Sequence, residues 1–229
     1  MDTAGLDTIV APPPSSRREA GKAKRRRLII GAARDLIRET GNAGLSMRGL
    51  AARAGVSLAT PYNLFGSKRA IVVAVLHDVR AFYERFSQVE GLDPVERIFA
   101  ALDISIAFYL DDPLFYRTLW SALFDASDAV RGDILTPRRD AFWRGLIDDA
   151  ASTGAIADDI DLDLLQHHLE LSLRAVMFDW VVGQTSPERL GPTARFGYAL
   201  ILLGAASPDW RAPLKARLLG GQAVLSRLQ

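Results

Sequence analysis

The sequence contains no cysteine among its 229 residues. This absence excludes disulfides, thiolate metal sites and cysteine nucleophiles, and it fits the reducing environment of the cytoplasm. Long apolar runs are also missing. The most apolar stretch, "YALILLGAA" from Tyr198 to Ala206, is far shorter than the roughly 20 residues that a membrane-spanning helix needs. We therefore expect a cytoplasmic protein that has no membrane partner.

The sequence also lacks the short motifs of common catalytic sites. It contains no Gly-x-Ser-x-Gly elbow, no phosphate loop ending in Gly-Lys-Ser/Thr and no Gly-x-Gly-x-x-Gly. Two of its three histidines, His167 and His168, are adjacent, so on a helix they point about 100° apart and cannot both bind one metal ion. We expect no enzyme, no metal and no cofactor.

Charge is unevenly distributed along the chain, although its net value is only +1. Residues 1–69 hold 13 lysines and arginines against 5 acidic residues, a net charge of +8. Residues 70–229 hold 15 basic against 22 acidic residues, a net charge of −7. A basic segment attracts a polyanion, whereas an acidic remainder keeps the rest of the surface away from it.

Residues 1–21 are expected to form a disordered basic arm. The opening residues end in "APPPSS", whose proline run cannot enter a helix. The next stretch, "RREAGKAKRRR" from Arg17 to Arg27, carries seven basic residues and one acidic residue. It is either a solvated tail or an arm that lies along a phosphate backbone.

Residues 22–69 show the pattern of three helices. A first helix of about four turns is expected from Arg25, because apolar residues then recur at helical spacing. Ser46 can cap a second, shorter helix, and Gly55 then supplies a turn in which a positive φ is needed. Two short helices joined by such a turn, behind a longer helix, are typical of a helix-turn-helix.

Pro61 lies in the third helix, which is expected from about Leu58 to Leu64. The first N–H groups of a helix have no acceptor within it, so a proline near the start removes at most one hydrogen bond. Two starts fit this placement. Either Ser57 caps the helix and Pro61 strains its first turn, or Thr60 caps it and Pro61 is the first helical residue.

The stretch "LSMRGLAARAGVSLATPYNLFGSKRAIV", from Leu45 to Val72, resembles the DNA-binding segment of TetR-family transcriptional regulators. It matches the family pattern Leu-Ser/Thr-x-Arg, Ala-x-x-Ala-Gly-Val-Ser, Tyr-x-x-Phe and Ser-Lys-x-x-Leu/Ile, and the specific match covers roughly residues 25–75. It departs from the family at Pro61, where a bulky apolar residue is usual, and at Leu64, where a histidine or another polar residue often stands.

The resemblance implies an all-α protein with a three-helix DNA-binding domain, residues 22–69, and a larger helical effector-binding and dimerisation domain, residues 70–229. It implies a double-stranded DNA operator as partner, and DNA contacts from eight residues: Ser46, Arg48, Ser57, Ala59, Thr60, Tyr62, Asn63 and Lys68. Their chemistry suits these contacts, because arginine can pair with guanine, asparagine with adenine, and hydroxyls and lysine with phosphates.

The residues after 69 show helical spacing throughout. A linking helix is expected from Ala70 to Phe86, followed by about six further helices and no strand. Twelve of the 19 aromatic residues lie between Phe82 and Trp143, and they form either core or the lining of an apolar pocket. The residues proposed for an effector pocket are Phe108, Phe115, Tyr116, Trp120, Phe124, Trp143, His167 and Arg174.

A homodimer is expected, because family members pair two helices from each subunit into a four-helix bundle and a two-fold operator requires a two-fold protein. One predicted stripe runs along the helix from Leu162 to Val182, and the second lies on the following helix, where small residues permit close approach. The interface residues predicted on these stripes are Leu165, Leu169, Ser172, Val176, Trp180, Thr193, Gly197, Leu200 and Gly204.

Together these features predict a repressor that binds a palindromic operator as a dimer and is released by a small apolar or aromatic effector. Three alternatives remain. The chain is a helical enzyme or carrier with an acquired basic N-terminus, a non-specific architectural DNA binder, or a helix-turn-helix regulator whose pocket is vestigial. The acidic C-terminal part argues against an architectural protein, because packaging DNA gains nothing from a net negative domain.

Overall fold

The structure is a computed structural model that describes residues 17–40, 45–76, 80–124 and 137–228. Over these residues the regular secondary structure is helical, which confirms the expected all-α class. The chain divides into two compact units. None of the described helices is long and apolar enough to cross a membrane.

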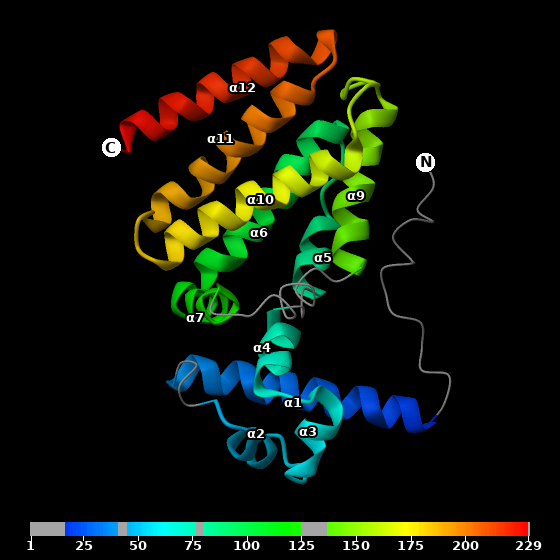
Figure 1. Ribbon diagram of the computed structural model, residues 1–229, viewed down its shortest axis with the longest axis vertical. Helices are drawn as coiled ribbons and strands as arrows, with labels where there is room; N and C mark the ends of the chain where they lie inside the picture. Colours follow the sequence, from blue (N-terminus) through cyan, green and yellow to red (C-terminus); the bar gives the residue numbers. More distant parts are fainter. Residues whose placement is uncertain (1–16, 41–44, 77–79, 125–136, 229) are drawn as a thin grey trace. The chain divides into compact units, whose positions relative to one another are not determined.

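The first unit contains five helices of the described chain, including one that comes from the middle of the sequence (Figure 1). These helices are α1 (Arg17–Thr40), α2 (Met47–Arg53), α3 (Ala59–Phe65), α4 (Lys68–Leu76) and α7 (Pro113–Phe124). Their core is built around α1, whose Ile29 and Ala33 are fully buried. Ile71 of α4 and Phe115 of α7 pack into the same cluster.

Helix α1 begins at Arg17, eight residues before the expected start at Arg25. The part of the predicted arm from Arg17 onward is therefore helical, whereas residues 1–16 lie outside the described residues. Lysine, arginine, alanine and glutamate all favour helix, and Glu19 in the first turn complements the helix dipole. The apolar spacing could not reveal this start, because the first two turns bury no side chain of their own.

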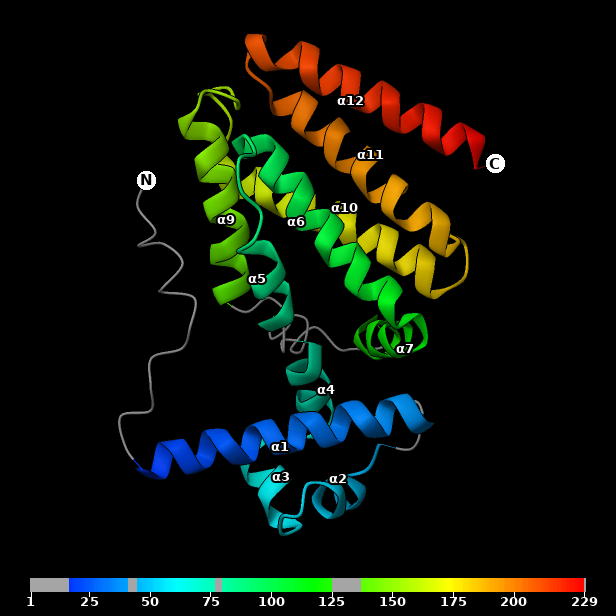
Figure 2. The same ribbon diagram turned by 180° about the vertical axis from the view of Figure 1, so that it is seen from behind.

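The second unit contains the remaining described helices (Figures 1 and 2). They are α5 (Arg80–Phe86), α6 (Pro94–Asp111), α9 (Pro137–Ser152), α10 (Leu162–Val181), α11 (Pro187–Ala205) and α12 (Pro208–Arg227). Helix α11 lies between α10 and α12 and contacts both, while α6 contacts α9 and α11. The helix expected from Ala70 to Phe86 is described as α4 and α5, and residues 77–79 between them lie outside the description.

Aromatic side chains join α5 to α9 within the second unit. The ring of Phe142 on α9 meets Phe82, Tyr83 and Phe86 of α5 edge to face, with centroid distances of 5.3, 5.3 and 5.0 Å. These T-shaped contacts are a favourable arrangement of aromatic quadrupoles. Much of the aromatic surplus in the sequence therefore serves as helix packing.

The loops that precede α10 and α12 are tied together by backbone hydrogen bonds. Ile156 and Ala206 form an isolated antiparallel bridge. The N–H of Ala157 donates to the carbonyl of Ala205 at 2.9 Å, and the N–H of Ser207 donates to the carbonyl of Ala155 at 3.1 Å. This bridge fixes one end of the α10–α11–α12 layer.

Helices α10 and α11 approach each other closely where Ser172 faces Gly197. A Cβ atom built on Gly197 would lie 2.5 Å from Ser172 Oγ but 3.9 Å from Ser172 Cβ. The small residues predicted to bring two subunits together therefore bring two helices of one chain together.

This contact predicts a non-additive pair of substitutions. In the natural chain we expect Gly197→Ala to lose most of the gain that alanine brings to a helix, because the added methyl group forces the Ser172 hydroxyl into another rotamer. In a Ser172→Ala background the same change should stabilise by about 0.5–1 kcal/mol, since alanine is the better helix former. Urea unfolding of the four proteins measures the difference, and equal effects in both backgrounds would contradict this packing.

Candidate nucleic-acid interface

The turn between α2 and α3 is fixed by local hydrogen bonds, as the sequence predicts. Ser46 caps α2, and its Oγ accepts a hydrogen bond from the N–H of Gly49 at 3.1 Å. Gly55 adopts a φ of +64°, a backbone conformation that residues other than glycine rarely take. The N–H of Val56 then donates to the carbonyl of Ala51 at 3.0 Å, which closes the turn over the end of α2.

The start of α3 differs from both predicted alternatives. Leu58 holds the N-cap position and makes no side-chain cap, so neither Ser57 nor Thr60 stands there. The hydroxyl groups of Ser57 and Thr60 lie 2.9 Å apart, and the N–H of Thr60 donates to the carbonyl of Ser57 at 2.9 Å. The serine therefore stabilises the turn before the helix.

Pro61 is the third residue of α3, and its side chain is buried. At this position a residue has no intrahelical acceptor for its N–H, so the proline removes no helical hydrogen bond. Its apolar ring points inward, at the position where the family pattern described above has a bulky apolar residue. The departure from the family pattern thus leaves the helix intact and still supplies a buried apolar group.

The C-terminal end of α3 is held by an arginine from α1. The Nη1 atom of Arg26 donates to the carbonyl of Leu64 at 2.6 Å, and its guanidinium lies 4.3 Å from the ring centroid of Phe65. A cation at this end also complements the helix dipole. Arg26 is a positioning residue that sequence reasoning missed, because nothing in the spacing of the basic run distinguishes it from its neighbours.

A second polar contact joins the ends of α1 and α2. Arg53 donates to both carboxylate oxygens of Glu39, Nη1 to Oε1 at 2.9 Å and Nη2 to Oε2 at 2.6 Å. The hydrogen bond from Arg53 lowers the pKa of Glu39 below its ordinary value. The stabilisation from this pair is therefore present above the pKa of glutamate in the unfolded chain, and it is lost as the pH falls through the lower folded-state pKa.

Most of the predicted DNA-contacting side chains are solvent-exposed. Tyr62 is 52% exposed, and Leu58, which precedes α3, is 46% exposed. Within α3, Pro61 is buried, and Leu64 and Phe65 pack against the core of the first unit. The face that carries Ala59, Tyr62 and Asn63 is available to a partner. The exposed predicted residues are Ser46, Arg48, Ser57, Ala59, Tyr62 and Asn63, and the half-buried ones are Thr60 and Lys68.

The structure distributes the predicted effector residues over both units. Phe115, Tyr116 and Trp120 belong to the first unit, where Phe115 and Trp120 are buried. Phe108, Trp143, His167 and Arg174 belong to the second. There the Arg85 guanidinium lies 4.2 Å from the Phe108 ring centroid, and Trp143 packs edge to face on Tyr198 at 6.3 Å. The side chain of Phe124 lies outside the described part of the structure.

The predicted dimer stripe on α10 faces the core of its own subunit. Four of its residues are at most 8% exposed and pack inside the second unit: Leu165, Leu169, Val176 and Trp180. Ser172 and Gly197 face each other within the chain, and Thr193 is half-buried. Leu200, which is 53% exposed, and Gly204 remain on the surface. The buried residues of this stripe therefore pack within one chain.

The sequence of the helix-turn-helix region matches a known protein family. The model of "Bacterial regulatory proteins, tetR family" matches residues 29–75, which run from α1 to α4. Comparison with curated proteins gives no match.

Solved structures share the fold at low sequence identity. A TetR transcriptional regulator from Rhodococcus sp. RHA1 is 21% identical, with a TM-score of 0.62 over 82% of this chain and 99% of that one. RolR in complex with resorcinol is 19% identical, with a TM-score of 0.63 over 87% and 95%. FadR from Bacillus subtilis in complex with stearoyl-CoA is 18% identical, with a TM-score of 0.59 over 77% and 97%.

The contact between Arg26 and the end of α3 predicts a specific loss of stability. We expect Arg26→Met to lower the free energy of unfolding by about 1–2 kcal/mol, because it removes a hydrogen bond from a charged donor and a cation–π contact. Arg25→Met is the matched control, since Arg25 is exposed and its replacement should change stability by less than about 0.5 kcal/mol. Urea unfolding measures both, and equal losses would contradict the role of Arg26.

Proposed function

The chain belongs to the tetR family of bacterial regulatory proteins and is a DNA-binding transcriptional regulator; on this premise we propose that it is a repressor. It binds a palindromic operator as a homodimer, and a small apolar or aromatic effector releases it. The observation that carries the proposal is the exposed surface of α3. This short helix is held at both ends by the first unit while its polar and aromatic side chains remain accessible.

The chemistry of this surface suits the major groove of duplex DNA. Asn63 can pair with both edge groups of adenine, and Arg48 can make a forked contact with guanine or with a phosphate. Tyr62, Thr60 and Lys68 suit phosphates, while the methyl groups of Ala59 and Leu58 can contact a thymine methyl. Ser46 accepts the capping hydrogen bond, and its hydroxyl proton can still be donated to a phosphate.

The charge of the first 69 residues supports the same assignment. Their net charge of +8 would release counterions from a phosphate backbone, which makes affinity fall as salt rises. The basic run from Arg17 to Arg27 belongs to helix α1. We propose that this helical extension contacts phosphates without reading sequence.

Two substitutions test the assignment of α2 and α3. We expect Arg48→Ala to weaken operator binding by about 1–3 kcal/mol if the guanidinium reads a base and by less if it contacts a phosphate. Tyr62→Phe should weaken binding through the loss of one phosphate hydrogen bond. Fluorescence anisotropy with a labelled duplex measures both changes. Arg211→Ala removes the same charge from the second unit, and an equal effect of that variant would refute the proposed interface.

We propose that the homodimer forms through the outer face of α10. Leu164, Leu171, Phe178 and Val182 are between 41% and 60% exposed. They follow one another at spacings of seven, seven and four residues, which is the pattern of a helix–helix seam. Leu200 of α11 is a further exposed apolar residue. A dimer with two-fold symmetry would bury these side chains and place two copies of α3 at successive half-sites.

A charge on this face should prevent dimer formation. We expect Leu171→Asp to shift the protein to a monomer in sedimentation velocity at micromolar concentration, because the interface would bury an unpaired carboxylate. Leu219→Asp is the control, since Leu219 of α12 has a similar exposure of 52%. Dissociation by Leu219→Asp alone would place the interface on α12 instead.

Two solved structures of the same fold contain a small ligand, which supports a small-molecule effector for this chain. RolR binds resorcinol and FadR binds stearoyl-CoA, according to their crystal complexes. An effector of this chain would bind in the second unit and release DNA only if it binds one arrangement of the dimer better than another. A regulator with a vestigial pocket, or an enzyme, would show no loss of operator affinity with any ligand that binds.

A further inference from the structure

Arg174 of α10 has two buried guanidinium nitrogens without a hydrogen-bond acceptor. Its Nε and Nη2 atoms are inaccessible to solvent, and no described residue provides a partner for either of them. A guanidinium keeps its positive charge when it is buried, so desolvation without an acceptor is unfavourable. Each such group in a folded protein calls for an explanation, and a bound anion is one of them.

Five other arginines of the second unit are paired with a carboxylate. These pairs are Arg85 with Asp111, Arg97 with Asp149, Arg144 with Asp148 and Asp163, Arg195 with Asp103, and Arg217 with Glu96. Arg189 and Arg211 of the same unit donate to backbone carbonyls instead. Nε and Nη2 of Arg174, by contrast, have no acceptor among the described residues. Outside this unit, Arg69 of α4 is the other described arginine in which the same two nitrogens are buried without a partner.

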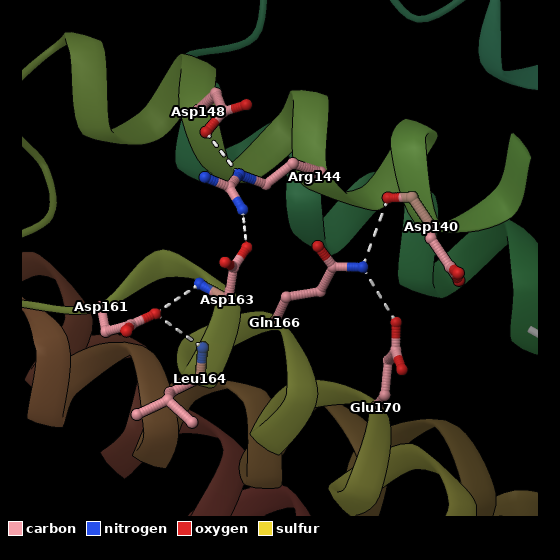
Figure 3. Close-up of polar contacts among 8 residues, drawn as sticks. All are labelled: Asp140, Arg144, Asp148, Asp161, Asp163, Leu164, Gln166 and Glu170. Carbon is pink, nitrogen blue, oxygen red and sulfur yellow. Dashed lines mark hydrogen bonds and ion pairs between the residues drawn. The ribbon is translucent and has the colours of Figure 1, made fainter. Parts of the chain in front are cut away.

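The carboxylate nearest to Arg174 along its helix is engaged elsewhere. Glu170 lies four residues before Arg174, at a spacing that favours an ion pair on one helix face. Its Oε1 instead accepts a hydrogen bond from Gln166 Nε2 at 3.0 Å. The same Nε2 atom also donates to the carbonyl of Asp140 on α9 at 3.3 Å. Figure 3 shows Glu170 as the end of this network between α9 and α10. Nε and Nη2 of Arg174 receive no acceptor from it.

The two unpartnered nitrogens form one edge of the guanidinium group. The N–H bonds of Nε and Nη2 are parallel, so this edge matches the two oxygens of a carboxylate in a forked arrangement. The neighbours of Arg174 on the core side of α10 are apolar, since Leu173 and Met177 are almost fully buried. A charged edge beside apolar core suits a ligand that has an acidic head and an apolar body.

We propose that Arg174 binds the carboxylate of an organic acid, and that this acid is the effector. The ligand class rests on the geometry of the second unit alone, whereas its regulatory role rests on the function proposed above. Arg174 thus narrows the expected effector from any apolar or aromatic molecule to one that carries a carboxylate.

The stability of the ligand-free protein gives the first test. Arg174→Met keeps the length of the side chain and removes the unpaired charge, so we expect the Tm to rise by roughly 2–4 °C. Arg97→Met is the matched control, because Arg97 donates to Asp149 at 2.9 Å, and its Tm should fall. A fall of similar size for Arg174→Met would show that the guanidinium is already satisfied and would overturn the proposal.

Binding of matched probes gives the second test. We would compare benzoate with benzamide and octanoate with octanamide by thermal shift at constant ionic strength. Each probe is used at about 10 mM, a concentration that suits the weak affinity of a small fragment. At least one acid should raise the Tm of the natural protein more than its amide does, and this difference should vanish in Arg174→Met. Equal shifts for acid and amide with both pairs, or a difference that survives in Arg174→Met, would overturn the proposal.

Operator binding separates this inference from the proposed function. An acid that binds through Arg174 should weaken binding to the operator duplex in the natural protein and leave Arg174→Met unaffected. If the acid binds through Arg174 but DNA affinity does not change, the anion site stands and the regulatory role fails. If Arg174→Met itself loses DNA affinity without any acid, Arg174 is a structural residue and the inference is wrong.

Discussion

Helix α3 has seven residues, and a helix of two turns is not stable in water on its own. Its existence therefore depends on contacts with the rest of the first unit. At its start, Pro61 places an apolar ring in the interior at a position that needs no N–H. At its end, Arg26 of α1 binds the Leu64 carbonyl and lies against Phe65. Because both of these contacts lie on the inner side of the helix, its outer surface is not needed to stabilise the fold.

The same dependence explains the length and position of α1. Its buried face supplies Ile29, Ala33 and Ile37 to a core shared with α2, α4 and α7. One turn before this apolar stretch, Arg26 reaches the end of α3. A single helix thus provides both the core on which the helix-turn-helix rests and the polar contact that sets the end of α3. The basic residues that precede Arg26 extend this helix toward its N-terminus without contributing to the core.

The sequence predicted the helix-turn-helix well because its determinants are local. The Ser46 cap and the positive φ of Gly55 follow from residue type and spacing alone. The start of α1 at Arg17 could not be placed, since basic residues favour helix and solvated coil alike. The position of α3 was predicted to within one residue, but its N-cap at Leu58 was missed, because leucine is an unfavourable N-cap residue.

It was harder to predict the role of a residue where that role depends on which face of its helix packs into the core. Helix α10 has two apolar stripes, one through Leu165 and Trp180 and another through Leu164 and Leu171. Periodicity cannot decide which of them faces the core, and the structure buries the first. The aromatic residues posed the same problem, because packing on Phe142 and lining a pocket require the same residue types. The sequence could not show that Nε and Nη2 of Arg174 lack an acceptor, since this depends on the hydrogen bond between Glu170 and Gln166.

We propose that two copies of α3, related by two-fold symmetry, recognise duplex DNA. The most direct measurement is selection of bound sequences from a library of random duplexes by the purified protein. We expect enrichment of a palindrome whose half-site centres lie about one helical turn apart. Recovery of unenriched sequences, or of a motif without two-fold symmetry, would contradict it.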